Sequence, residues 1–148
     1  MKRIMKITYP AFALACLALT LTACGVAYQQ QRSDILKTAS AGSFGPPPPE
    51  NYRSIGEAFY KRKLKDPDSA KFEWVGSPRH EAIQAGFGSP HAVPVWVTPL
   101  RINAKNSFGG YTGFDVFGLA WKNGKIVAYT SELQSGVGYW QYVQGDSI

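Results

Sequence analysis

The chain has 148 residues, of which 45% are hydrophobic and 18% charged, a balance that favours one packed domain and excludes global disorder. Its formal net charge is +6, but three of the sixteen basic residues, Lys2, Arg3 and Lys6, precede every acidic residue. Without that N-terminal stretch, thirteen basic and ten acidic residues leave a net charge of +3. This charge is too small to predict nucleic-acid binding, and we expect no nucleic-acid partner.

Residues 1–23 have the organisation of an export signal. A basic start, 1–6, is followed by an apolar run of thirteen residues, 11–23, which suits a signal-peptide core and is shorter than the roughly 20 residues that span a bilayer. The run ends in Leu21-Thr22-Ala23-Cys24, which resembles the cleavage motif of bacterial lipoproteins. The resemblance implies cleavage before Cys24 and a diacylglycerol thioether on its sulfur, within an anchor of several acyl chains such as palmitate. The alternatives are an ordinary secretory signal or a short anchor with a chance cysteine.

The resemblance also implies a location and limits the chemistry. Gly25, rather than an aspartate, follows Cys24, which by similarity to enterobacterial sorting favours the periplasmic face of the outer membrane. The only other cysteine, Cys16, lies in the segment that would be removed. The mature chain would then have no free thiol, and so no internal disulfide, no cysteine metal site and no cysteine nucleophile.

Residues 24–50 are predicted to be the lipidated cysteine and a flexible tether. The segment is rich in Gly, Ala, Ser and Gln, has no sustained apolar period, and ends in the four prolines Pro46–Pro49. Such prolines favour a stiff polyproline II stretch, and a flexible chain of this length spans about 25–30 Å. A proline-rich ligand for an aromatic groove is the alternative. Residues 34–39 could form one helical turn.

Residues 51–148 are predicted to form a small α+β domain that begins with a helix over 51–65. Tyr52, Ile55 and Phe59 lie at helical spacing on one apolar face. Lys61, Arg62, Lys63 and Lys65 crowd the last turn, where cations meet the negative end of the helix dipole, and Pro67 closes the element. The alternative use of this basic cluster is contact with phosphate.

The rest of the domain is predicted to be a mostly antiparallel sheet of four to five strands, on which the helix packs. Prolines in the strand that starts at Val93 favour an edge or irregular position. Asn123-Gly124 between two apolar runs predicts a type I′ hairpin, because that turn needs positive φ twice. The expected strands are 71–75, 93–97 continuing through 100–103, 111–121, 126–131 and 137–143, with a long loop over 76–92.

Two stretches carry a family resemblance. They are LKDPDSAKF at 64–72 and NAKNSFGGYTGF at 103–114, and together they resemble a family of small, functionally uncharacterised domains of exported bacterial proteins. The resemblance spans roughly 52–131 and implies no established activity. The family pattern often has a Cys-Gly pair before the Asn-Ala-Lys-Asn, whereas Pro99-Leu100 precede it here, so any role of that cysteine is absent.

The glycine-rich loop within the second stretch is the candidate recognition element. Its glycines allow positive φ or close backbone approach, while its polar and aromatic side chains could flank a ligand. A hairpin connection with aromatic packing is the alternative, and the phosphate-loop pattern is missing. The candidate residues are Asn103, Lys105, Asn106, Phe108, Gly109, Gly110 and Tyr111.

The sequence contains no recognisable catalytic set. His80 and His91 are the only histidines, and His80-Glu81 lacks the second histidine of a metalloprotease helix. These three side chains could gather around a metal only by accident of folding. Nothing in the sequence brings Asp115 and Glu132 together as a carboxylate pair. We therefore predict no catalytic residue, no metal and no cofactor, and do not expect an enzyme.

Three functions fit these observations. The first is an outer-membrane-anchored, non-enzymatic module that binds an envelope protein or helps in envelope assembly, as the anchor and aromatic strands suggest. The second is a small domain that binds or hydrolyses cell-wall or lipid material, which would need a histidine in a cleft beside a carboxylate. The third is binding of a phosphate-rich ligand through 61–65 and Lys105, which would be strongly salt-dependent.

Overall fold

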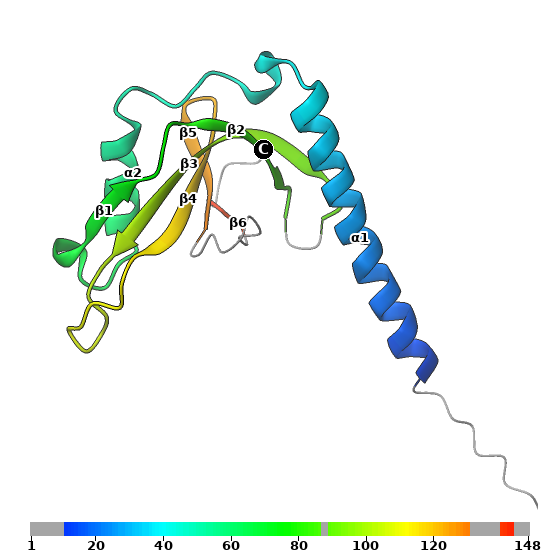
Figure 1. Ribbon diagram of the computed structural model, residues 1–148, viewed down its shortest axis with the longest axis horizontal. Helices are drawn as coiled ribbons and strands as arrows, with labels where there is room; N and C mark the ends of the chain where they lie inside the picture. The colour runs from blue at the N-terminus through cyan, green and yellow to red at the C-terminus, as the bar shows by residue number, and fades with distance from the viewer. Residues whose placement is uncertain (1–10, 87–88, 131–139, 144–148) are drawn as a thin grey trace, which may run out of the picture.

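The computed structural model describes residues 11–86, 89–130 and 140–143 (Figure 1). Helices come first along the chain and strands follow, as expected for an α+β protein. In chain order the elements are α1 Ala11–Thr38, the 3-10 helix η1 Ala41–Phe44, α2 Tyr52–Lys61, the 3-10 helix η2 Pro67–Ser69, β1 Lys71–Trp74, β2 Arg79–Gln84, β3 Ala92–Asn103, β4 Asp115–Lys122, β5 Lys125–Thr130 and β6 Trp140–Tyr142.

The strands form one antiparallel sheet, which confirms the predicted α+β class. Its order is β1-β3-β4-β5-β6, with β2 also paired to β3, so the described residues form six strands rather than the four to five predicted. The extra strand is β2, because the predicted loop over 76–92 was wrong for Arg79–Gln84. The segment Arg-His-Glu-Ala-Ile-Gln is weakly apolar, and only its pairing with β3 makes it a strand.

The position predicted for the proline-containing strand was also wrong, because β3 is the long central strand of the sheet. Pro99 lies between the part of β3 that pairs with β2 and the part that pairs with β1, and its carbonyl accepts from the Val75 amide at 3.1 Å. Pro94 directs its carbonyl to the Lys122 ammonium at 2.7 Å, beyond the last β3–β4 pair. In an antiparallel strand, the N–H and C=O of one residue point toward the same neighbouring strand. The nitrogens of Pro94 and Pro99 therefore point, like their carbonyls, to positions beyond the ends of the pairing with β4 and β1. Neither proline removes a hydrogen-bond donor that a paired strand residue needs.

The hairpin between β4 and β5 forms as predicted. Asn123 has φ of 52° and Gly124 has φ of 76°, the two positive values that a type I′ turn requires. The strands around it are close to the predicted ranges, although β4 begins at Asp115 and not at residue 111. The first predicted strand corresponds to β1, and β6 covers Trp140–Tyr142 of the predicted last strand, of which residues 140–143 are described.

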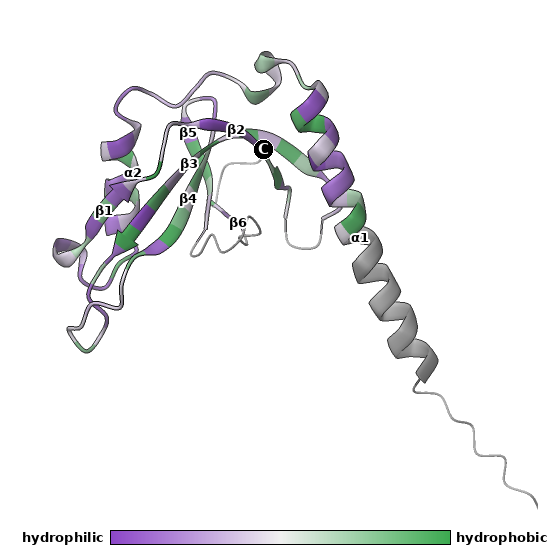
Figure 2. Ribbon diagram, viewed as in Figure 1, coloured by the Kyte–Doolittle hydropathy of each residue, from purple (hydrophilic) through white to green (hydrophobic). Residues whose placement is uncertain are grey.

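The core has one cluster on each face of the sheet. Alternate residues of β3 divide between them: Leu100 and Ile102 join α2 residues Phe59 and Tyr60, whereas Val95 and Val97 join Ile83 on the other face. Figure 2 shows the apolar residues running along the central strands. Helix α2 comes close to the sheet at Gly56, where an added Cβ would lie 2.6–2.7 Å from side-chain atoms of Trp74 and Leu119.

A buried tyrosine of α2 bridges β4 and β5 where their regular pairing ends. The Tyr60 hydroxyl lies 2.9 Å from the Gly118 carbonyl oxygen and 3.0 Å from that of Thr130. The Thr130 hydroxyl in turn accepts from the Gly118 amide at 3.0 Å. Burial raises the pKa of Tyr60 far above its ordinary value, so the hydroxyl stays neutral and can donate to these carbonyls. These contacts satisfy backbone groups for which no strand partner exists.

The predicted flexible tether over 24–50 was wrong for most of its length, because residues 25–38 are helical and dock on the sheet. Tyr28 donates to the Ala82 carbonyl at 3.2 Å, and Gln31 accepts from the Ala92 amide at 2.7 Å. Arg32 pairs with Glu81 at 2.8 Å. Helix α1 thereby covers the free edge of β2, which would otherwise expose unpaired backbone groups.

The segment after α1 also packs on the domain. Phe44 of η1 is 2% exposed and stacks on His80, with ring centroids 4.0 Å apart. The Trp96 indole donates to the Gly45 carbonyl at 3.0 Å, and Pro48 is buried. The helical turn predicted at 34–39 is the last part of α1. Within the described residues, no helix is both long enough and apolar enough to cross a membrane.

Candidate functional site

The glycine-rich loop joins β3 to β4 at the end of the sheet farthest from α1, as Figure 1 shows. Asn106 orders its tip: the side-chain Oδ1 accepts from the amides of Phe108 at 2.9 Å and Gly110 at 3.1 Å. The Asn106 amide also donates to the Gly110 carbonyl at 2.9 Å, and Gly109 adopts a φ of 79° that favours glycine. The loop therefore presents Phe108, which is 96% exposed, from a defined backbone.

The two stretches that carry the family resemblance meet in space. Ser69, at the end of η2, accepts from the Lys105 amide at 3.0 Å through its hydroxyl. Its carbonyl accepts from the Tyr111 hydroxyl at 3.0 Å. Asp66 caps the same turn, because its carboxylate accepts from the Ser69 amide. The turn after α2 thus braces the base of the loop, where Lys105 and Tyr111 also form an isolated bridge.

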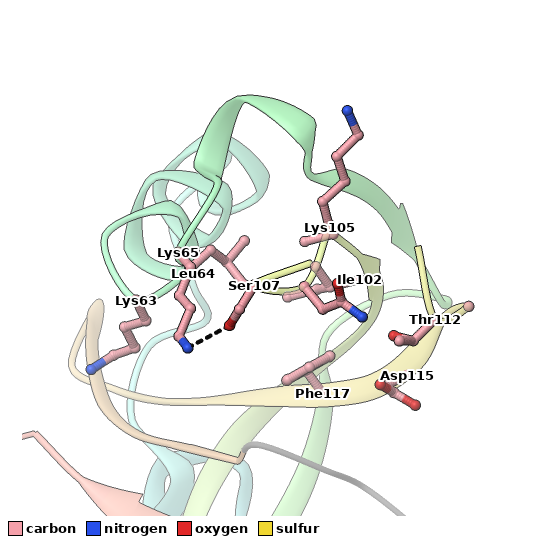
Figure 3. Close-up of a pocket in the computed structure, with 12 residues that line it drawn as sticks. Lys63, Leu64, Lys65, Ile102, Lys105, Ser107, Thr112, Asp115 and Phe117 are labelled. Carbon is pink, nitrogen blue, oxygen red and sulfur yellow. Dashed lines mark hydrogen bonds between the residues drawn. The ribbon is translucent and has the colours of Figure 1, made fainter. Parts of the chain in front are cut away.

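A pocket of about 380 Å³ lies between the end of α2 and this loop (Figure 3). Lys65 and Ser107 face each other across it, and the ammonium donates to the hydroxyl at 2.7 Å. Thr112 and Asp115 line another side of the pocket, as Figure 3 shows. Its lining therefore combines hydrogen-bond donors with a single carboxylate, and apolar side chains such as Phe117 complete it.

Not all the predicted loop residues contribute to this site. Asn103 does not line the pocket, and its Oδ1 is buried without a hydrogen-bond partner among the described residues. Lys105 and Asn106 line the pocket, while Phe108 and Tyr111 are exposed outside it. Sequence reasoning missed Ser69, Ser107 and Thr112. Single hydroxyl residues in polar segments carry no pattern that could have indicated their role.

The histidines do not form a catalytic or metal site in the described part of the chain. His80 packs between Phe44 and Trp96, and Glu81 is occupied by its ion pair with Arg32. Across 11–86, 89–130 and 140–143, no three His, Cys, Asp or Glu side chains gather in a way that could hold a metal. Asp115 lines the pocket beside the loop, whereas Glu132, its hypothetical partner, lies outside the described residues.

Comparison with protein-family models, with curated proteins and with solved structures finds no match to this chain. The resemblance to exported bacterial domains, and the lipoprotein signal, therefore stay predictions from the sequence.

Proposed function

We propose that this protein is a lipid-anchored, non-enzymatic protein of the outer membrane's periplasmic face, and that its loop over 103–114 binds an envelope protein. The observation that carries the proposal is Phe108, a large apolar side chain that is 96% exposed at the tip of an ordered loop. Exposed aromatic residues are frequent anchors of protein interfaces. A loop already held by Asn106 loses little conformational entropy when it binds.

The position of Cys24 supports a fixed arrangement of anchor and loop. Tyr28, the first docked residue of α1, follows Cys24 by four residues, which is about 6 Å along a helix. A lipid on Cys24 would thus hold the domain beside the membrane and not lift it on a flexible spacer. The loop lies at the far end of the sheet, where it faces partners away from the anchor (Figure 1).

The anchor is tested by replacing Cys24 with serine. We expect the variant to lose incorporation of labelled palmitate completely and to keep residues 1–23, because both modification and cleavage depend on the thiol. Mass spectrometry and palmitate labelling of whole cells measure both effects. Cys16→Ser is the matched control and should be labelled and cleaved normally. Equal labelling of the two variants would show that Cys24 is not the lipidated residue.

The loop is tested by placing a photo-reactive phenylalanine analogue at Phe108 in the full lipoprotein. Illumination of intact cells should give a discrete adduct with an envelope protein. The same analogue at Ile55, an exposed position of α2, should give none.

Phe108→Ala should weaken the binding free energy for the partner by about 2 kcal/mol, which is roughly a thirtyfold rise in the dissociation constant, as for an interface anchor. Absence of any adduct from position 108 would refute loop-mediated partner binding.

A further inference from the structure

The positive charge of the mature chain is concentrated at one end. The region around the loop, which we call the basic end, comprises residues 61–71, which run from the last residue of α2 to the first residue of β1, and the loop from Asn103 to Asp115. The two parts are joined by the contacts of Ser69 and Lys65. Its acidic residues are Asp66, Asp68 and Asp115. The rest of the chain from residue 24 on holds seven basic and seven acidic residues. The basic residues of the basic end are Lys61, Arg62, Lys63, Lys65, Lys71 and Lys105.

These cations are not neutralised by ion pairs. Among the described residues the ion pairs are Arg32–Glu81 and Arg101–Glu73, and neither includes a residue of the basic end. Lys65 instead donates to the Ser107 hydroxyl across the pocket. Lys71 and Lys105 lie 4.8 and 5.8 Å from the centre of the Tyr111 ring. Ring contacts hold the ammonium groups in place without cancelling their charge.

We propose that the basic end binds an acidic segment of the partner protein. A carboxylate of that segment enters the pocket beside Lys65 while Phe108 contacts its apolar residues. The inference rests on the proposed function and adds the chemistry of the partner to it. Charge complementarity supports it, because a surface of uncompensated lysines steers carboxylates to the loop and rejects basic partners. The carboxylate of Asp115 lines the same pocket and limits how many negative groups enter.

The position of the basic end favours a protein carboxylate over the phosphates of the anchoring membrane. The lipid would be attached at Cys24 in α1, and the loop lies at the opposite end of the sheet (Figure 1). Lipid headgroups next to the anchor would meet α1 and the β2 side first. An anionic partner that reaches the loop must approach from the other side.

Charge reversal tests this inference on the full lipoprotein in nonionic detergent. The test variant is Lys63→Glu/Lys65→Glu/Lys105→Glu, and the control is Lys37→Glu/Arg79→Glu/Lys125→Glu, which changes the net charge equally at exposed positions elsewhere. The probe is fluorescent poly-L-glutamate, measured by anisotropy at low ionic strength. We expect binding to weaken at least about tenfold in the test variant and less than about twofold in the control. Equal weakening in both would show only a general charge effect and overturn the inference.

Two further measurements separate the possible outcomes. Inorganic phosphate and phosphatidylglycerol vesicles are offered to the wild-type protein. If they bind the basic end more tightly than poly-L-glutamate, the ligand is phosphate and the inference is wrong. The photo-adduct at position 108 is then compared between the wild type and the test variant in cells. An adduct of undiminished yield in the test variant would refute the acidic partner while leaving the proposed function intact, whereas its loss would support both.

Discussion

Replacing Trp121 with alanine should lower the free energy of unfolding by about 3–5 kcal/mol, the range for truncating a buried tryptophan. The side chain is 1% exposed in the core cluster beneath α2, and the indole N–H donates to the Thr98 hydroxyl at 2.8 Å. Truncation would leave a cavity and remove the hydrogen-bond partner of Thr98, which is itself 1% exposed. Chemical denaturation followed by circular dichroism measures the change.

Trp121→Phe separates the two contributions. Phenylalanine refills most of the cavity but cannot donate to Thr98, so we expect a smaller loss of about 1–3 kcal/mol, as for a buried polar group left unpaired. If the free energy of unfolding of Trp121→Ala lies within about 1 kcal/mol of the wild-type value, then this side chain is not buried in the core.

Replacing Gly56 with leucine should destabilise the protein by about 1–3 kcal/mol or more, although leucine is the better helix former by nearly 1 kcal/mol. The reason is steric, because even a Cβ at this position would lie 2.6 Å from the Trp74 ring and 2.7 Å from the Leu119 side chain. The helix would have to move off the sheet. The shift of the denaturant concentration at the midpoint of unfolding measures the effect, provided that the dependence of the unfolding free energy on denaturant is the same in both proteins.

Ser54→Leu provides the control within the same helix. Ser54 is exposed, so leucine there gains helix propensity without meeting the sheet, and stability should change by less than about 0.5 kcal/mol. The contrast between positions 54 and 56 tests the close packing of α2 directly. A stabilising effect of Gly56→Leu would show that α2 does not rest on Trp74 and Leu119.

Local chemistry predicted the elements that depend on adjacent residues. Asn123-Gly124 specifies its own turn, because few residues tolerate positive φ. Strand β2 and the central position of β3 were not predictable in this way, because both depend on pairing between distant segments. Pro99 illustrates the difference: its sequence context indicates an irregular strand, yet β3 changes neighbours at that residue and no donor is missed.

The docking of α1 was missed for a physical reason. Four of its half-buried residues, Tyr28, Gln31, Arg32 and Ile35, lie on one face at helical spacing, but two of these four are polar. A search for apolar periodicity does not detect a face that binds through hydrogen bonds and an ion pair. Figure 2 shows this mixture of hydrophilic and hydrophobic residues along the docked part of α1.

The candidate loop itself was predictable from its glycines and aromatic residues, but its supports were not. Ser69 contacts Lys105 and Tyr111 across about forty residues of sequence, a separation that leaves no local signal. The same holds for the hydrogen bond from Lys65 to Ser107. The pocket is a product of these long-range contacts and so becomes visible only in the folded chain.

Strand β3 also determines how this protein would carry mechanical load. The Ala92 amide, at its first residue, donates to Gln31 of α1, and its last residue, Asn103, opens the loop. Tension between a membrane anchor and a partner on the loop would therefore run lengthwise through one strand. Such a pull would load the covalent backbone of β3, and the hydrogen bonds to its neighbours, which lie perpendicular to that direction, would not be peeled apart one by one. A pull of this kind would not unzip the sheet.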